Sequence, residues 1–124
     1  MAAESAEALQ IVDTLYEYAS VPGGGFVYAV GHPDGFVKIG RASNPFARIS
    51  DLQTGSPYEL RLLSYTGFYN VSDAEALLLA KFDPWLVRGE WFNLPSGLAE
   101  ILCDNQRVRE LVDELRGHEE SGSK

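Results

Sequence analysis

Apolar and β-branched residues form two short runs in the first third of the chain, with turn-forming residues between them. The runs are residues 26–30 and 36–40, and a Pro-Asp-Gly sequence at residues 33–35 separates them, which predicts a β-hairpin. Apolar residues then alternate along residues 59–66. This alternation predicts a third strand with one well-covered face and one mixed face.

Apolar residues at helical spacing, together with capping residues, indicate the helices. Residues 3–19 have an amphipathic pattern with acids between the apolar positions. A capping residue followed by proline predicts a short helix over residues 45–53. Ser72 and Glu75 have the spacing of a capping box, so we expect the next helix to begin there and to end before Pro84.

The last third of the chain has a weaker pattern. Residues 89–93 are aromatic and predict a short strand or extended segment. Residues 98–116 carry apolar positions at helical spacing, with a break expected near residues 104–105. Residues 117–124 have no core-forming content and are expected to be a flexible tail.

The composition describes one globular domain. A chain of 124 residues that is 45% hydrophobic is long enough for one core and too short for two. Cys103 is the only cysteine, so an internal disulfide is excluded and a reducing, cytoplasmic setting fits best. No apolar run approaches the roughly 18–20 residues of a membrane span. Residues 1–22 carry four acids and no base, unlike a signal peptide.

The charge is unevenly distributed. The formal net charge of −8 argues against a generic binder of the phosphate backbone, since such binding depends on Lys and Arg. The acids gather toward the two ends of the chain, whereas residues 36–61 contain four bases and two acids. Arg41 and Arg61 belong to this basic segment and are expected to contact nucleic acid.

Four residues have the chemistry that phosphodiester cleavage requires. Tyr28 and Lys38 fall on adjacent strands of the predicted hairpin and can face the same side of the sheet. Arg48 lies one turn inside the following helix, and Glu75 opens the next one. A proton acceptor for water, cations for the phosphoryl charge and a hard oxygen ligand for Mg²⁺ would then surround one concavity.

Each of these residues also has a structural interpretation. Tyr28 fits a strand aromatic packed on the core, and Lys38 fits a solvent-facing strand residue. Arg48 fits an exposed helix residue paired with Asp51 or Asn44. The capping-box spacing explains Glu75 as part of a helix cap.

The histidines and the aromatic segment near residue 90 are weaker candidates for a functional site. His32 precedes a proline in a turn, His118 lies in the tail, and no His, Cys or Asp cluster has zinc-ligand spacing. The segment Glu90-Trp91-Phe92 is interpreted as a hydrophobic plug with an exposed acid rather than as a stacking platform for bases, because such platforms usually accompany a positive groove.

The order of motifs along residues 25–95 resembles the GIY-YIG nuclease superfamily, and more narrowly its small phage-type DNA-binding branch, in which the second motif reads KIG. The motifs are Phe26-Val27-Tyr28, Lys38-Ile39-Gly40-Arg41, Arg48, Leu52-Gln53-Thr54-Gly55-Ser56-Pro57, Glu75 and Arg88-Gly89-Glu90-Trp91-Phe92.

The resemblance implies an α+β fold with a small three-stranded antiparallel sheet flanked by helices, to which extra N- and C-terminal helices are added. The expected divisions are residues 1–22 (acidic N-terminal helix), 23–95 (GIY-YIG-like core), 96–116 (C-terminal helices) and 117–124 (flexible tail).

The resemblance also implies hydrolysis of DNA with a single divalent cation, Mg²⁺ or Mn²⁺, by one attacking water. Tyr28 matches the tyrosine that positions or deprotonates the water, and Lys38 matches the second-motif aromatic. Arg48 matches the arginine that stabilises the phosphoryl transition state, and Glu75 matches the metal ligand. Gly40 would keep the strand end open for the backbone to approach.

The sequence therefore favours a metal-dependent DNA endonuclease-like domain. One alternative is a non-catalytic nucleic-acid-binding module that keeps the same fold. The other is a protein-interaction module in which the acidic first and last helices contact a protein partner.

Overall fold

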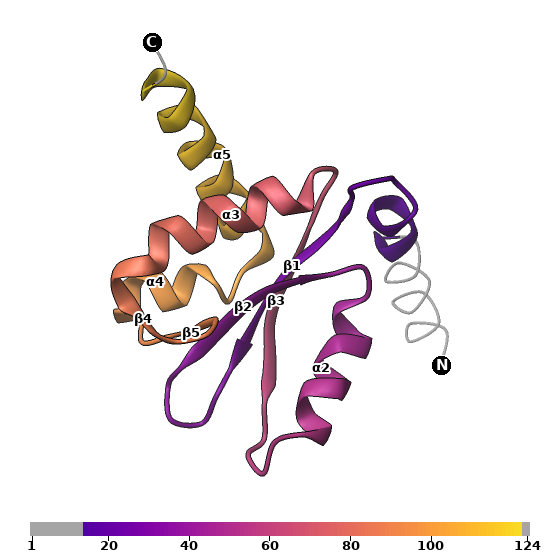
Figure 1. The fold of residues 1–124 in the computed structure, drawn as a ribbon, viewed down its shortest axis with the longest axis vertical. Helices are drawn as coiled ribbons and strands as arrows, with labels where there is room; N and C mark the ends of the chain where they lie inside the picture. The colour runs from indigo at the N-terminus through magenta and orange to yellow at the C-terminus, as the bar shows by residue number, and fades with distance from the viewer. Residues whose placement is uncertain (1–13, 123–124) are drawn as a thin grey trace.

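The computed structural model describes residues 14–122 and contains a five-stranded antiparallel sheet packed with helices (Figure 1). The strand order is β3-β1-β2-β5-β4. The strands are β1 (Gly25–Gly31), β2 (Val37–Ala42), β3 (Arg61–Phe68), β4 (Leu86–Arg88) and β5 (Trp91–Phe92).

The hairpin and the third strand are confirmed, but the expectation of a three-stranded sheet is wrong. The two additional strands form a tight hairpin around Gly89, which has the positive φ of +59° that glycine adopts readily. Only two residue pairs join β5 to β2, Val37 with Phe92 and Lys38 with Trp91. The short strand predicted within residues 89–93 is confirmed as β5, whereas β4 was not predicted, because its three residues are too few for alternation to show.

Helices cover both faces of the sheet. Figure 1 shows α3 (Val71–Phe82), α4 (Ser96–Ile101) and α5 (Asn105–Gly122) on one side of the strands and α2 (Pro45–Thr54) on the other. The face under α3, α4 and α5 holds the main core, in which Leu102 and Val112 of the C-terminal segment pack with strand residues such as Ile39. The C-terminal helices are therefore part of the same core as the sheet.

The opposite face of the sheet carries aromatic residues. The ring of Phe46 on α2 lies 4.9 Å from that of Tyr65 on β3. Tyr18, from the helical residues 14–19, makes an edge contact with Phe26 at 5.5 Å. The rest of the expected N-terminal helix, residues 3–13, lies outside the described residues.

The start of α2 is confirmed, whereas the start of α3 differs from the prediction. Asn44 caps α2 and accepts hydrogen bonds from the backbone N–H groups of Phe46 and Ala47, both at 3.1 Å. The cap of α3 is Asn70, whose side chain accepts a hydrogen bond from the Asp73 N–H at 3.2 Å. The predicted capping box of Ser72 and Glu75 does not form, because the helix begins before Ser72.

The predicted break in the C-terminal helical segment is confirmed. Asp104 accepts hydrogen bonds from the N–H groups of Gln106 and Arg107 at 2.9 and 3.2 Å, which starts α5. The predicted helix end at residue 116 is too early, because α5 continues to Gly122. Within residues 14–122 no helix combines the length and apolar character needed to cross a membrane.

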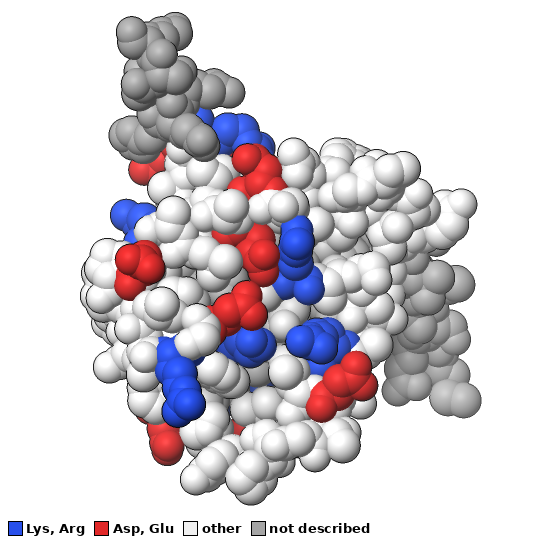
Figure 2. All heavy atoms as spheres, viewed as in Figure 1, with Lys and Arg blue, Asp and Glu red and all other residues white. Residues whose placement is uncertain are grey.

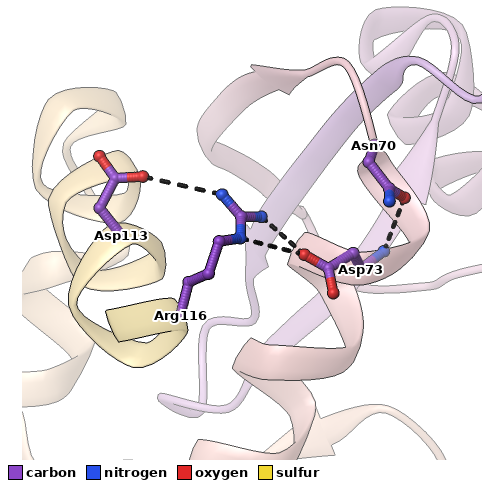
Figure 3. A network of polar contacts seen from close by, with 4 residues as sticks. All are labelled: Asn70, Asp73, Asp113 and Arg116. Atoms are coloured by element: carbon purple, nitrogen blue, oxygen red, sulfur yellow. Dashed lines mark hydrogen bonds and ion pairs between the residues drawn. The ribbon is translucent and has the colours of Figure 1, made fainter. Parts of the chain in front are cut away.

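An ion-pair network joins α3 to α5 (Figure 3). Arg116 of α5 donates two hydrogen bonds to the Asp73 carboxylate, at 2.7 and 3.2 Å, and lies 3.9 Å from Asp113. These side chains are partly exposed, so the network contributes at most about 1 kcal/mol. It fixes the first turn of α3, which also carries Asn70 and precedes Glu75.

Candidate functional site

Tyr28 occupies the middle of the central strand and lies across Gly40. The two residues are direct cross-strand partners, and Tyr28 is only 2% exposed. A Cβ atom on Gly40 would lie 2.9 Å from Cε2 of the Tyr28 ring and closer still to Cζ and the hydroxyl oxygen. The glycine therefore makes room for this ring, and that is a different role from the expected opening for an approaching backbone.

Lys38 lies on the same face of the sheet as Tyr28. It is paired with Val30, two residues beyond Tyr28 on β1, so the two side chains are diagonal neighbours on that face. Its side chain is only 12% exposed, and its Nζ lies 3.3 Å from Oε1 of Glu90. The interpretation of Lys38 as a solvent-facing strand residue is therefore wrong.

Arg48 reaches the same place from α2. The Tyr28 hydroxyl group, as a hydrogen-bond acceptor for the guanidinium, is the main cause of a raised pKa of Arg48, with smaller contributions from Asp51 and Glu90. The residue itself is exposed to solvent. A guanidinium directed at a tyrosine hydroxyl and open to solvent remains available to an incoming anion.

Glu75 enters the site from α3. Its side chain is 14% exposed and lies 3.5 Å from Nε of Arg41 on β2. Burial is the main cause of a raised pKa of Glu75, the charge of Glu90 raises the pKa further, and Arg41 and Lys38 partly oppose this. The interpretation of Glu75 as a helix cap is excluded, because Asn70 holds that position.

Glu90 is the site residue that the sequence interpretation missed. The acid of the predicted plug is ion-paired with Lys38 and affects the pKa of both Glu75 and Arg48. Its backbone carbonyl also accepts a hydrogen bond from the Ile39 N–H at 3.2 Å. The sequence signals were its place beside Trp91 and within the motif Arg88-Gly89-Glu90-Trp91-Phe92. Neither signal shows that β5 pairs with β2 and so sets Glu90 next to Lys38.

The structure thus brings the four predicted catalytic residues together with Arg41 and Glu90. Figure 2 shows acidic and basic side chains intermingled on the face between α3 and α2. Arg61 is not part of this group. It pairs with Gly31 at the far end of β1, and the contacts that link the other charges do not include it.

A cavity of about 350 Å³ lies beside Arg41 and is bounded by the Gly23-Gly24 loop and the first residues of α3. The four predicted catalytic residues do not line this cavity. Among the described residues there is no group of three or more His, Cys, Asp or Glu side chains that could hold a metal ion. The acidic ligands that this site offers are the neighbouring carboxylates of Glu75 and Glu90.

The fold and the site together define a small α+β domain with a mixed cluster of cations and carboxylates at the centre of its sheet. The chain belongs to the T5orf172 domain family, whose model matches residues 25–116. This is a phage-associated, nucleic-acid-related domain. The match includes α4 and most of α5, in agreement with their place in the core. No curated protein and no solved structure matched the chain.

Proposed function

We propose that this protein is a divalent-metal-dependent DNA endonuclease of the GIY-YIG type. The observation that carries the proposal is the convergence of Tyr28, Lys38, Arg48 and Glu75, which come from β1, β2, α2 and α3, on one site. The T5orf172 family supports a nucleic-acid substrate.

The cations suit a phosphodiester group. Arg48 carries a planar fork of donors that matches phosphate oxygens, and an arginine is charged at every working pH. Lys38 is held by a single carboxylate, so a phosphate oxygen that enters the site can replace Glu90 as its partner. Both cations would stabilise the negative charge that develops on the phosphoryl oxygens.

Tyr28 would act on the attacking water. Its hydroxyl group is the main cause of the raised pKa of Arg48, and its ring lies across Gly40, which leaves room for it. In the proposed reaction the water oxygen forms a bond to phosphorus and one ester P–O bond breaks. The water loses a proton, the leaving oxygen gains one, and the products are a phosphate monoester and an alcohol.

The donor set fits a single hard cation. Glu75 is a largely buried carboxylate whose charge is disfavoured by burial and by Glu90, so a divalent cation beside it would relieve both penalties. Mg²⁺ commonly takes only one or two protein carboxylates and completes its coordination with water and phosphate oxygens. Bound there, Mg²⁺ or Mn²⁺ would supply Lewis-acid stabilisation of the phosphoryl group.

The experiment is cleavage of supercoiled plasmid and of branched DNA in Mn²⁺ or in EDTA. We expect metal-dependent nicking by the wild type and loss of most of the rate in Arg48→Lys, because the ammonium lacks the bidentate fork. Arg107→Lys, an exposed arginine on α5, is the matched control and should keep the wild-type rate.

Wild-type turnover in Arg48→Lys would remove Arg48 from the mechanism. Salt-dependent DNA binding with no cleavage of any substrate would instead indicate a binding module that keeps the same fold. Indifference to DNA would favour the protein-interaction alternative.

A further inference from the structure

Aromatic rings gather at the hairpin end of the sheet, next to the proposed catalytic site. We define the aromatic cluster as His32, Tyr58 and Trp91. The His32 ring lies 4.7 Å from that of Tyr58 and 5.9 Å from that of Trp91. The cluster therefore joins the β1–β2 turn, the segment after α2 and β5.

The aromatic cluster lies on the same face of the sheet as Lys38. Trp91 is the direct cross-strand partner of Lys38, and direct partners point to the same side of a sheet. The next residue, Phe92, is paired with Val37 and is buried in the main core on the other face. The two aromatic residues of the predicted plug therefore lie on opposite faces of the sheet. Phe92 packs in the core, and Trp91 lies beside Lys38.

Tyr58 is exposed although its backbone is firmly held. The residue is 51% exposed. Its carbonyl accepts hydrogen bonds from Gln53 Nε2 at 2.7 Å and from Ser56 Oγ at 3.1 Å, and its N–H donates to Ser56 Oγ at 3.1 Å. Gln53 also accepts from the Leu60 N–H at 2.8 Å.

These hydrogen bonds come from the segment Leu52-Gln53-Thr54-Gly55-Ser56-Pro57 and hold the backbone of Tyr58, whose ring contacts His32. Tyr58 differs from a core aromatic residue because its ring is exposed. It differs from an ordinary surface tyrosine because hydrogen bonds hold its backbone. A firmly held, half-exposed ring near a positively charged site is typical of sites where nucleobases stack.

We propose that the aromatic cluster binds an unpaired base of the DNA strand whose phosphate lies at Lys38 and Arg48. This proposal rests on the proposed function and names the substrate class, which is DNA with single-stranded or flipped bases. A base within a duplex has both faces covered by its neighbours, so Tyr58 can stack only on a base that has left the helix. The charge of Lys38 supports this ligand, because Lys38 is the direct cross-strand partner of Trp91.

The test is binding of a short fluorescein-labelled single-stranded DNA, measured by anisotropy at low salt in Ca²⁺ and again in EDTA. The comparison strand has the same backbone but abasic residues in place of the nucleotides. We expect the wild type to bind the intact strand more tightly than the abasic strand. Tyr58→Leu should weaken binding of the intact strand by about 5- to 100-fold and remove the preference.

Two further variants separate stacking from folding. Tyr58→Phe keeps the ring and should retain the preference for the intact strand. Tyr16→Leu changes a tyrosine that is 74% exposed on the N-terminal helix and should bind like the wild type. Thermal unfolding of all three variants checks that the fold is kept.

Equal affinity of the wild type for the two strands, no binding of either strand, or unchanged binding by a folded Tyr58→Leu variant would each overturn the proposal. Its failure is distinguishable from that of the proposed function. Tyr58-dependent binding without plasmid cleavage would support base stacking and refute the nuclease activity. Cleavage without Tyr58-dependent binding would support the nuclease activity and refute base stacking.

Discussion

At the scale of single residues, the acids decide how the site responds to pH. In the proposed site Glu75 would bind a cation in its ionised form, and its raised pKa means that ionisation is complete only at a higher pH than for an ordinary glutamate. Cation binding should therefore weaken on acidification sooner than it would at an ordinary carboxylate. Below the raised pKa, protonated Glu75 no longer offers this site a charged ligand.

The pair of Glu75 and Glu90 gives the first residue-scale prediction. Glu90→Gln removes a negative charge that disfavours ionised Glu75, so the pKa of Glu75 should fall toward its ordinary value. The measurement is a carboxyl-carbon NMR titration of Glu75 in the metal-free protein. Glu59→Gln, an exposed acid outside the site, is the control and should leave the titration unchanged. A Glu75 pKa that stays the same or rises in Glu90→Gln would contradict the geometry described.

At the scale of secondary-structure elements, the cap of α3 sets the position of Glu75. The helix begins one turn ahead of Glu75, so its carboxylate projects from the body of the helix into the site and leaves the first turn to Asn70. Arg116 holds the same turn through Asp73.

The element-scale prediction distinguishes the two possible caps. Asn70→Ala should lower the free energy of unfolding by about 1 kcal/mol, because the Asp73 N–H loses its acceptor. Ser72→Ala should change it by less than about 0.5 kcal/mol, as is usual for surface positions. Urea unfolding measures both. A larger loss of unfolding free energy in Ser72→Ala than in Asn70→Ala would contradict this cap and support the capping box.

The sequence predicted the elements with strong local signals. The hairpin has a Pro-Asp-Gly turn, α2 has Asn44 and Pro45 at its start, and the break before α5 has Asp104. The cap of α3 was misplaced because Asn70 and Ser72 are both good capping residues, and the sequence does not show which one the preceding strand delivers to the helix start.

The sequence predicted only those site residues to which the resemblance assigns a role. Tyr28, Lys38, Arg48 and Glu75 were found, and Gly40 was found for a different reason from the one the structure gives. Glu90 was missed as a site residue, since its role depends on the register between β5 and β2. Register depends on tertiary packing, which a two-residue strand does not encode locally.

At the scale of the whole molecule, the C-terminal segment forms part of the core. Four of their residues are buried there: Leu102, Val108, Leu111 and Val112. The expected division at residue 95 would therefore cut through one hydrophobic core, and the family match to residue 116 extends across the same helices.

The whole-molecule prediction is that a chain truncated after residue 95 does not fold. Loss of a single large core side chain typically costs about 2–5 kcal/mol, against a total stability of about 5–15 kcal/mol. Truncation after residue 117 removes none of the four buried residues and is the matched control. Amide NMR dispersion and far-UV circular dichroism measure the outcome, and a well-folded 1–95 fragment would refute the single-core account.

The central claim is that Glu75 serves a metal-dependent phosphodiester site. Because burial and Glu90 disfavour its charge, Glu75→Gln should leave the protein folded and at least as stable at neutral pH, where the wild-type carboxylate is ionised against these penalties. The direction of this effect follows from the raised pKa of Glu75. A carboxyl group whose pKa is higher in the folded protein than in the unfolded one stabilises the fold at pH values below its ordinary pKa. This stabilisation is lost as the pH rises through the raised pKa.

The most direct measurement is therefore nicking of supercoiled plasmid in Mn²⁺ by the wild type and by Glu75→Gln, with thermal unfolding of both proteins alongside. The account predicts nicking by the wild type that EDTA abolishes, and none by a fully folded Glu75→Gln variant. Equal nicking by the two proteins, or no nicking by a folded wild type, would contradict it.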